Sequence, residues 1–190
     1  MTFTTTHLSR YFIASFPFAD VAESSYCYTA VAWAAGNGIT DGKTATTFDP
    51  SAFCTRAQVV TFLWRAMGSP EPAGTANPFT DVSSDAYYYK AVLWAVEKGI
   101  TKGTTNTTFD PDATVTRAQA VTFQYRAAGS PGAAAANPFS DVASGAYYTD
   151  AVLWAVNSGV TKGTSATAFS PAQTCTRDQI VTFLWRQFGI

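Results

Sequence analysis

In one short segment of the chain, apolar residues would occupy almost every side of a helix. Residues 87–98 read YYYKAVLWAVEK, and Gly99 follows them. A helix that is apolar all round is enclosed by protein, and a glycine just past the last turn is a common way for a helix to end. The pattern therefore predicts a buried helix over residues 87–98.

A second helix is predicted after the loop GITKGTTNTTFDP, whose glycines and threonines favour an irregular but ordered path. Thr116 is a good N-cap residue, and Gln119, three residues later, completes a capping box. The apolar run then continues to Gly129, with Arg126 in the last turn, where a cation interacts favourably with the helix dipole. The unit therefore reads as helix, loop, helix.

This unit occurs three times. The phrase F-x-D-V begins at Phe18, Phe79 and Phe139, at offsets of 61 and 60 residues, and the other landmarks keep the same offsets. Linkers rich in small residues and proline separate the copies and predict extended connections. We divide the chain into a poorly ordered lead-in (1–15), three repeats (16–68, 79–129 and 139–190) and two linkers (69–78 and 130–138).

Two short helices cannot bury both of their apolar faces alone, so the copies should pack together as they do in other repeat arrays. With three copies, a closed three-fold arrangement is as natural as an open stack. In a closed arrangement each neighbouring pair of copies forms one groove, which gives three similar grooves. The predicted fold class is all-α, with three tandem helix-loop-helix repeats.

Composition and charge exclude several classes of protein. The 190 residues are 47% hydrophobic, enough for a core, and only 13% charged, against about 25% in a typical soluble domain. The formal net charge of −1 argues against a nucleic-acid partner, which requires a dense basic stripe. No stretch approaches the ~20 apolar residues of a membrane span. Cys27, Cys54 and Cys175 are odd in number, lack C-x-x-C spacing, and are read as small apolar residues.

Catalysis is not expected. His7 is the only histidine and lies in the lead-in, and no Cys/His, Ser/His/Asp or metal-ligand constellation occurs. The acidic residues repeat with the fold or scatter in loops, so none forms the unique pair that a glycosidase needs. We expect no metal and no cofactor. No convincing signal peptide precedes the first copy, so we expect a fragment, a truncated gene product or a module of a longer protein.

In this order, the motifs resemble the S-layer homology domain. The middle copy shows FTDV, YYY, AVLWAVEKGITKG, FDP, TRAQ and YRAAG, and the match covers residues 18–189. The resemblance implies a pseudo-three-fold module around a central helical bundle. It also implies that the grooves bind secondary cell-wall polysaccharide, often carrying ketal-linked pyruvate. Such binding would anchor a protein non-covalently outside a bacterial cell, at the cell wall or S-layer.

Two other functions remain open at this point. The repeats could form a protein-interaction module that assembles with other surface-layer proteins of the envelope. They could also be the targeting end of a secreted enzyme whose catalytic domain lies outside this chain.

The arginine at the first position of each second helix is the sharpest candidate for ligand binding. The helix dipole opposes a cation there, yet Arg56, Arg117 and Arg177 hold this position in all three copies. Free helix N–H groups and a guanidinium make an anion site, and an arginine fork can grip the carboxylate of a pyruvate ketal. The alternative is a salt bridge to a nearby aspartate. We expect Arg→Ala to leave the fold intact and to matter least at Arg177, because Asp178 lies beside it.

Further recurring residues have a structural and a ligand-binding interpretation. The glutamines cap helices or contact ligand, and the aspartates of F-x-D-V cap helices or accept sugar hydroxyls. The tyrosines stack on a sugar ring or pack in the core, and the loop lysines are solvated or supply a second cation. Trp33, Trp94 and Trp154 are read as core residues. The candidates are Gln58, Gln119, Gln179, Asp20, Asp81, Asp141, Tyr26, Tyr87, Tyr147, Lys102 and Lys162.

Overall fold

The computed structural model of this chain describes residues 16–132 and 136–189, and the predicted lead-in with His7 lies outside the described residues. Within those ranges the chain forms helices and no β-sheet, which confirms the all-α class. The helices are α1 (Tyr28–Gly36), α2 (Arg56–Ala66), α3 (Tyr89–Glu97), α4 (Arg117–Ala127), α5 (Thr149–Asn157) and α6 (Arg177–Phe188). A helix long and apolar enough to cross a membrane does not occur in this part of the chain.

The second helix of each copy begins where the capping box predicts. In α4, Thr116 Oγ1 accepts a hydrogen bond from Gln119 N at 3.3 Å, and Gln119 Oε1 accepts one from Thr116 N at 3.0 Å. The same two bonds open α2. In α6, Asp178 Oδ1 accepts the hydrogen bond from Gln179 N at 2.7 Å, so the third copy uses an extra side chain in its cap.

The first helix of the middle copy is shorter than predicted. In the middle copy α3 spans Tyr89–Glu97 rather than 87–98, and no side chain caps its N-terminus. Its C-terminus agrees with the prediction. Gly99 takes a left-handed conformation with φ of +68°, and Ile100 N donates to Ala95 O at 2.8 Å, so the helix stops at the glycine.

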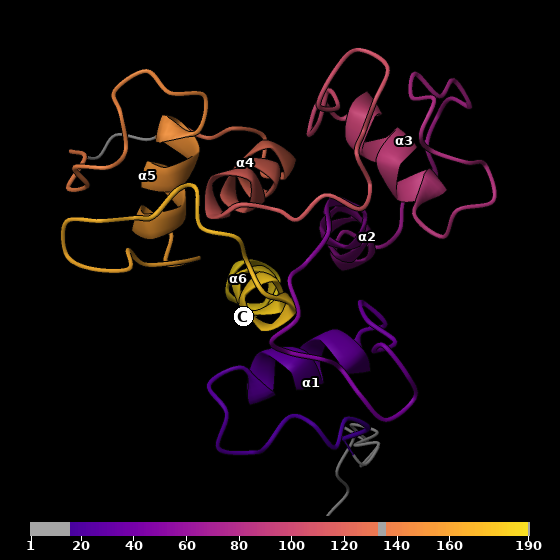
Figure 1. Cartoon of the computed structure of the whole chain (residues 1–190), viewed down its shortest axis with the longest axis horizontal. Coiled ribbons are helices and arrows are strands. Elements are labelled where there is room, and N and C mark those ends of the chain that lie inside the picture. Colours follow the sequence, from indigo (N-terminus) through magenta and orange to yellow (C-terminus); the bar gives the residue numbers. More distant parts are fainter. Residues whose placement is uncertain (1–15, 133–135, 190) are drawn as a thin grey trace, which may run out of the picture.

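The three copies form a closed ring. Figure 1 shows α2, α4 and α6 at the centre and α1, α3 and α5 around them. Each outer helix packs on the central helix of the preceding copy, α3 on α2 and α5 on α4. The ring closes where α1 of the first copy packs on α6 of the third. The closed pseudo-three-fold arrangement is therefore correct, and the open stack is excluded.

Three backbone hydrogen bonds link the copies just before the central helices. Cys54 N donates to Cys175 O at 2.9 Å, Cys175 N to Val115 O at 2.9 Å, and Val115 N to Cys54 O at 3.0 Å. All three side chains are fully buried. Burial raises the pKa of the Cys54 and Cys175 thiols to about 12, so both stay neutral and pack as small apolar groups, as predicted.

The core runs continuously through all three copies. Trp94 is buried in it, and Trp33 and Trp154 are half-buried against it, so the core assignment of the mid-helix tryptophans holds most fully in the middle copy. The linker 69–78 contains no helix, as predicted.

Candidate binding grooves

The arginine that opens each central helix reaches into the next copy. Arg56, at the start of α2, is buried and donates from Nε to the carbonyl oxygen of Phe109 at 2.8 Å. Its guanidinium carbon lies 4.8 Å from the centre of the Phe109 ring and 5.4 Å from that of Phe123. Burial lowers the pKa of the Arg56 guanidinium, but arginine is basic enough to keep its charge. A buried cation therefore lies between the first and second copies.

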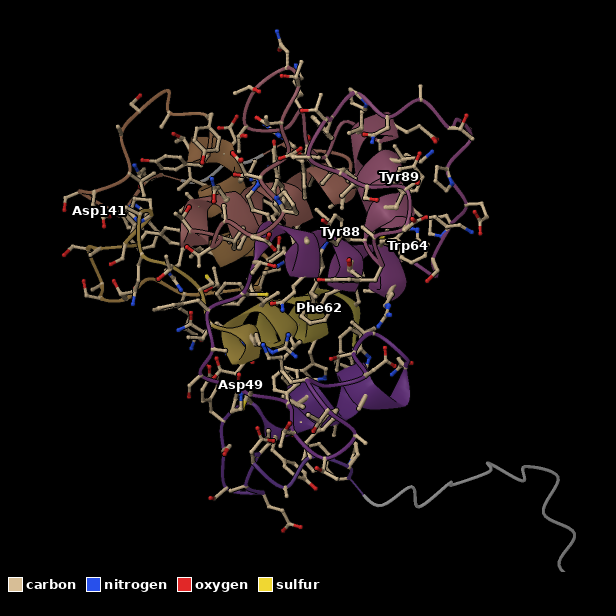
Figure 2. All side chains as sticks on the ribbon, turned by 45° about the vertical axis from the view of Figure 1, so that its right-hand side comes forward. Asp49, Phe62, Trp64, Tyr88, Tyr89 and Asp141 are labelled. Carbon is tan, nitrogen blue, oxygen red and sulfur yellow. The ribbon has the colours of Figure 1, made fainter. Side chains whose placement is uncertain are left out.

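The other two arginines repeat this arrangement around the ring. Arg117 Nε donates to Phe169 O at 3.0 Å, and Arg177 Nε donates to Phe48 O at 2.9 Å, so the third copy reaches back to the first. The Arg177 guanidinium carbon also lies 5.4 Å from the centre of the Phe62 ring, which Figure 2 shows beside α6. Each arginine thus joins two copies.

The N–H groups at these helix starts are not free. Arg117 N donates to Gln173 O at 2.8 Å and Ala118 N donates to Pro171 O at 3.0 Å, and the corresponding groups of α2 and α6 do the same. The prediction that free helix N–H groups form an anion site is therefore wrong, because the loop of the adjacent copy already occupies them. The predicted alternative is also absent, since no salt bridge in the described ranges joins one of these arginines to an aspartate. The guanidinium itself remains as the candidate anion binder.

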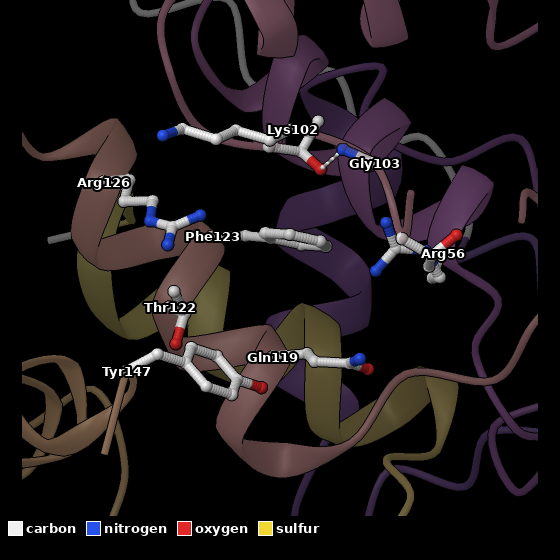
Figure 3. A pocket seen from close by; sticks show the side chains of 10 residues that line it. Arg56, Lys102, Gly103, Gln119, Thr122, Phe123, Arg126 and Tyr147 are labelled. Atoms are coloured by element: carbon white, nitrogen blue, oxygen red, sulfur yellow. Dashed lines mark hydrogen bonds between the residues drawn. The ribbon is translucent and has the colours of Figure 1, made fainter. Parts of the chain in front are cut away.

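A hollow of about 390 Å³, which we call groove A, lies beside the Arg56 guanidinium. All three copies contribute to it. Figure 3 shows the Phe123 ring between Arg126 and Arg56, with Gln119 and Tyr147 on one side and Lys102 on the other. The lining residues are Arg56, Thr101, Lys102, Gly103, Thr104, Gln119, Thr122, Phe123, Arg126 and Tyr147. The lining holds three cationic side chains and no acidic one.

A second hollow of about 320 Å³, groove B, is lined by the equivalent residues, each taken from the preceding copy around the ring. It is lined by Thr40, Asp41, Gly42, Lys43, Gln58, Thr61, Phe62, Arg65, Tyr87 and Arg177. Two differences affect its charge, and the first is Lys43 at the position of Thr104. Asp41 stands at the position of Lys102, and its Oδ2 lies 2.9 Å from Arg65 Nη1 in an ion pair.

Residues equivalent to those of grooves A and B meet at the third junction, which we call groove C and define by Tyr26, Lys162, Phe183, Arg186 and Arg117. The Arg117 guanidinium carbon lies 5.7 Å from the centre of the Phe183 ring. Arg117 Nη2 donates to Lys162 O at 2.9 Å.

Asp178 belongs to groove C rather than to the groove of its sequence neighbour. Burial raises the pKa of the Tyr26 hydroxyl, and a hydrogen bond and the negative charge of Asp178 raise it further, which places the two groups together. Arg177 instead lies in groove B, against Phe48. The premise behind the expectation that Arg177→Ala matters least is therefore wrong, because neighbours at the start of this helix point into different grooves.

The predicted tyrosines are exposed rather than buried in the core. Tyr26, Tyr87 and Tyr147 are 65%, 63% and 63% exposed. Tyr147 lines groove A and Tyr87 lines groove B. Tyr147 also borders a further hollow of about 260 Å³ on its other side, formed with Tyr148 and Pro171. The position suits stacking on a ligand, whereas core packing is excluded.

Two of the candidate glutamines both cap a helix and line a groove. Gln58 and Gln119 accept the capping hydrogen bond through Oε1. Gln119 lines groove A, and Gln58 lines groove B. Each keeps the Nε2 donors of its side-chain amide. Lys102 also lines groove A, and its role as a second cation for a ligand stays a prediction.

The aspartates of F-x-D-V lie outside both lining sets. Asp81 Oδ1 accepts a hydrogen bond from Phe109 N at 2.8 Å, and its Oδ2 accepts one from Asp110 N at 2.7 Å. Asp20 and Asp141 hold the equivalent loops, and Figure 2 shows Asp141 at the outer edge of the molecule. Their role as acceptors of sugar hydroxyls stays a prediction. In the described part of the chain, no group of three His, Cys, Asp or Glu side chains is placed to hold a metal ion.

Sequence reasoning missed the last-turn arginines as groove residues. We assigned Arg126 to the helix dipole, but it lines groove A and donates from Nη1 to Ile100 O at 3.0 Å. Arg65 does the same in groove B, with Ile39 O as acceptor at 3.2 Å. The signal was available, because an arginine recurs nine residues after the first one in every copy.

Comparison with known proteins matches all three copies to one family. The S-layer homology domain pattern matches residues 17–60, 78–121 and 138–181. The chain is 35% identical over 60% of its length to an endoglucanase of Bacillus sp. (strain KSM-635), and 34% identical over 62% to a surface-layer 125 kDa protein of Lysinibacillus sphaericus. It is 33% identical over 62% to a cell surface protein of Thermoanaerobacter kivui. The matched regions span only 12%, 10% and 16% of these relatives.

Proposed function

This chain belongs to the S-layer homology domain family, and from that premise we propose that it anchors a protein non-covalently to the bacterial cell surface by binding an acidic wall polysaccharide in the grooves between its copies. The residues act as a binding module, and we assign them no catalytic step.

One unpaired nitrogen of the guanidinium in groove A carries this proposal. Arg56 is buried, and its Nη2 has no hydrogen-bond acceptor. A buried donor without an acceptor costs about 1–3 kcal/mol, so an anion that supplies the acceptor is favoured. Lys102 and Arg126 line the same groove and add positive charge. The carboxylate of a pyruvate ketal offers the required acceptor and charge.

The uncharged lining of groove A suits the sugar ring that carries this carboxylate. Tyr147 presents an exposed aromatic face, and aromatic rings with a polar tip commonly bind groups that are apolar on one face and wet on the other. Gln119 keeps amide donors that can reach sugar oxygens. Anion recognition by arginine and stacking by tyrosine would therefore select an acidic saccharide over a simple anion.

The anchored cargo lies outside the matched regions. The relatives are named as surface-layer and cell surface proteins and as an endoglucanase, and the match covers a small part of each. We infer that this chain likewise serves as the attachment part of a longer extracellular protein, which is either a surface-layer protein or a secreted enzyme.

Co-sedimentation with purified cell-wall sacculi tests the proposal. The chain should sediment with intact sacculi and remain in solution after chemical removal of their polysaccharide. Sedimentation that survives this removal would contradict polysaccharide binding and favour a protein partner in the envelope. Arg56→Gln tests the groove, because it removes the charge and should weaken sedimentation while the capping Thr and Gln stay in place.

A further inference from the structure

We propose that the three grooves are unequal: groove A is the main polymer site, groove B is a weaker site, and groove C is closed by the chain itself. The inference rests on the proposed function, and it assigns a stoichiometry of two ligands to a module with three sequence copies.

The first observation concerns the donors of the three arginines. Arg56 and Arg177 each have a buried Nη2 with no acceptor, whereas Arg117 Nη2 donates to Lys162 O at 2.9 Å. All three side chains are at least nine-tenths buried. A ligand carboxylate gains an unused donor in grooves A and B, but in groove C it must first displace a carbonyl oxygen of the chain.

The second observation explains how groove C is closed. The same residues, Thr-Lys-Gly, border grooves A and C, but their backbones differ. In groove A, Gly103 has φ of +83° and its N–H donates to Thr101 Oγ1 at 3.1 Å. Gly163 is absent from the positive-φ residues, and Thr161 Oγ1 instead donates to Lys162 O at 3.2 Å. The peptide between Lys162 and Gly163 is therefore turned so that its carbonyl oxygen faces Arg117.

The third observation is the charge around each groove. Three cationic side chains and no acidic one line groove A, whereas groove B combines three cationic side chains, Lys43 among them, with the Asp41 carboxylate, which pairs with Arg65 at 2.9 Å. Groove C gains the carboxylate of Asp178 beside Tyr26. An acidic polymer is therefore repelled least in groove A. The order of affinity should be A, then B, with groove C unoccupied.

Calorimetric titration of the full chain measures this order. The probe is a methyl hexosaminide that carries pyruvate as a ketal across O4 and O6. The parent chain should bind two equivalents with different affinities. Three equal sites would overturn the inference. No binding of this probe or of purified wall polysaccharide would instead overturn the proposed function.

A double variant tests the closure of groove C without relying on how the titration curve of the parent chain is fitted. Arg56→Gln with Arg177→Gln should abolish binding although groove C is unaltered, and retention of one site with parental affinity would contradict the closure of groove C. Because these side chains are buried, a thermal unfolding curve of the double variant accompanies the titration.

Asp41→Asn is the matched variant with an expected gain of affinity, and the exposed position of Asp41 keeps its effect on folding small. It gives groove B the charge of groove A and should strengthen the weaker site by roughly two- to fivefold. An unchanged or weakened second site would contradict the charge argument.

Discussion

At the scale of single residues, one phenylalanine in each copy connects the two signature motifs. Phe109 donates its N–H to Asp81 of F-x-D-V and accepts a hydrogen bond from Arg56 of the preceding copy. The arginine side chain is thus fixed by a carbonyl oxygen and two aromatic rings before any ligand arrives. This explains how a cation can occupy a helix position that the dipole disfavours.

The same contacts argue against the expectation that Arg→Ala leaves the fold intact. Replacing buried Arg56 by alanine leaves the carbonyl oxygen of Phe109 without its hydrogen-bond donor and opens a cavity between two copies. We therefore use Arg→Gln, which keeps more of the side-chain volume than alanine and a neutral amide donor, wherever binding is the quantity of interest.

Asp141→Ala should lower the free energy of unfolding by about 1–3 kcal/mol, because it leaves the N–H groups of Phe169 and Ser170 without their acceptor. Asp141→Asn keeps one acceptor oxygen and should cost less. Urea denaturation measures both variants. Asp85→Ala is the control, since its side chain is exposed and makes no such bond, and an equal loss there would contradict the clamp.

These aspartates also predict how stability depends on pH. The N–H group of Phe169, then that of Ser170, lowers the pKa of Asp141. Burial of Asp20 acts to raise its pKa, but the N–H groups of Phe48 and Asp49 outweigh it, so the pKa is lowered. The folded state therefore binds fewer protons than the unfolded state in acid. Stability should be fully present above the unfolded pKa of about 3.9 and fall as pH drops through the lower folded values.

Urea denaturation as a function of pH checks this expectation. Asp141→Asn should show a weaker loss between neutral pH and about pH 3 than the parent. A parent whose unfolding free energy stays constant over that interval would contradict the assignment of these carboxylates as structural clamps.

At the scale of helices, the copies differ in how they begin α2, α4 and α6. Thr116 is the acceptor for Gln119 N in α4, whereas Asp178 takes the corresponding bond from Gln179 N in α6. In α6 the threonine hydroxyl donates to Asp178 instead. The third helix therefore depends less on its N-cap threonine.

Thr116→Ala should destabilise the chain by about 1 kcal/mol, the usual cost of losing an N-cap side chain. Thr176→Ala should cost less, because Asp178 still accepts the hydrogen bond from Gln179 N. Thermal unfolding of the two variants side by side measures the difference. Equal losses would show that Asp178 does not share the cap.

Sequence predicted where the second helices begin and where the first helices end because these signals are local. The capping box at Thr116 and the glycine after α3 act within a few residues, and both appear where expected. The partner of each helix could not be predicted in this way. Tandem copies carry the same motifs, so sequence alone does not tell whether Arg56 reaches its own loop or that of the next copy.

The same ambiguity explains which parts of the site were found. The candidates Arg56, Gln119 and Tyr147 do meet in groove A, although they come from three different copies. The prediction of free helix N–H groups was wrong because their hydrogen-bond acceptors, Pro171 O and its equivalents, lie on neighbouring copies. The inward carbonyl of Lys162 depends on a single peptide orientation, which no residue type in that identical Thr-Lys-Gly segment signals.

At the scale of the whole molecule, the ring makes stability and binding collective. Every outer helix has its partner in another copy, and the start of each central helix bonds to the next loop. A single copy would expose both the face of its outer helix and the donors of its central helix. It would also lack two of the three contributions to a groove.

Residues 79–129 alone should therefore show no cooperative thermal transition by circular dichroism, since α3 loses α2 and α4 loses α5. The full chain, with α1 on α6, should unfold in one cooperative step. A stable isolated copy would contradict the interlocked ring, and so would a full chain that melts in three independent steps.

The central claim is that a buried arginine donor in a groove built from three copies grips a polymer carboxylate. Calorimetry with two forms of the pyruvate-ketal hexosaminide tests it most directly, one with a free carboxylate and one as its neutral methyl ester. A hydrogen bond to a charged group contributes about 1.5–3 kcal/mol, so the free acid should bind the full chain roughly tenfold to a hundredfold more tightly than the ester. Arg56→Gln should remove most of that difference at the tighter site. Equal affinity of the two forms, or a difference that survives in the variant, would contradict the claim.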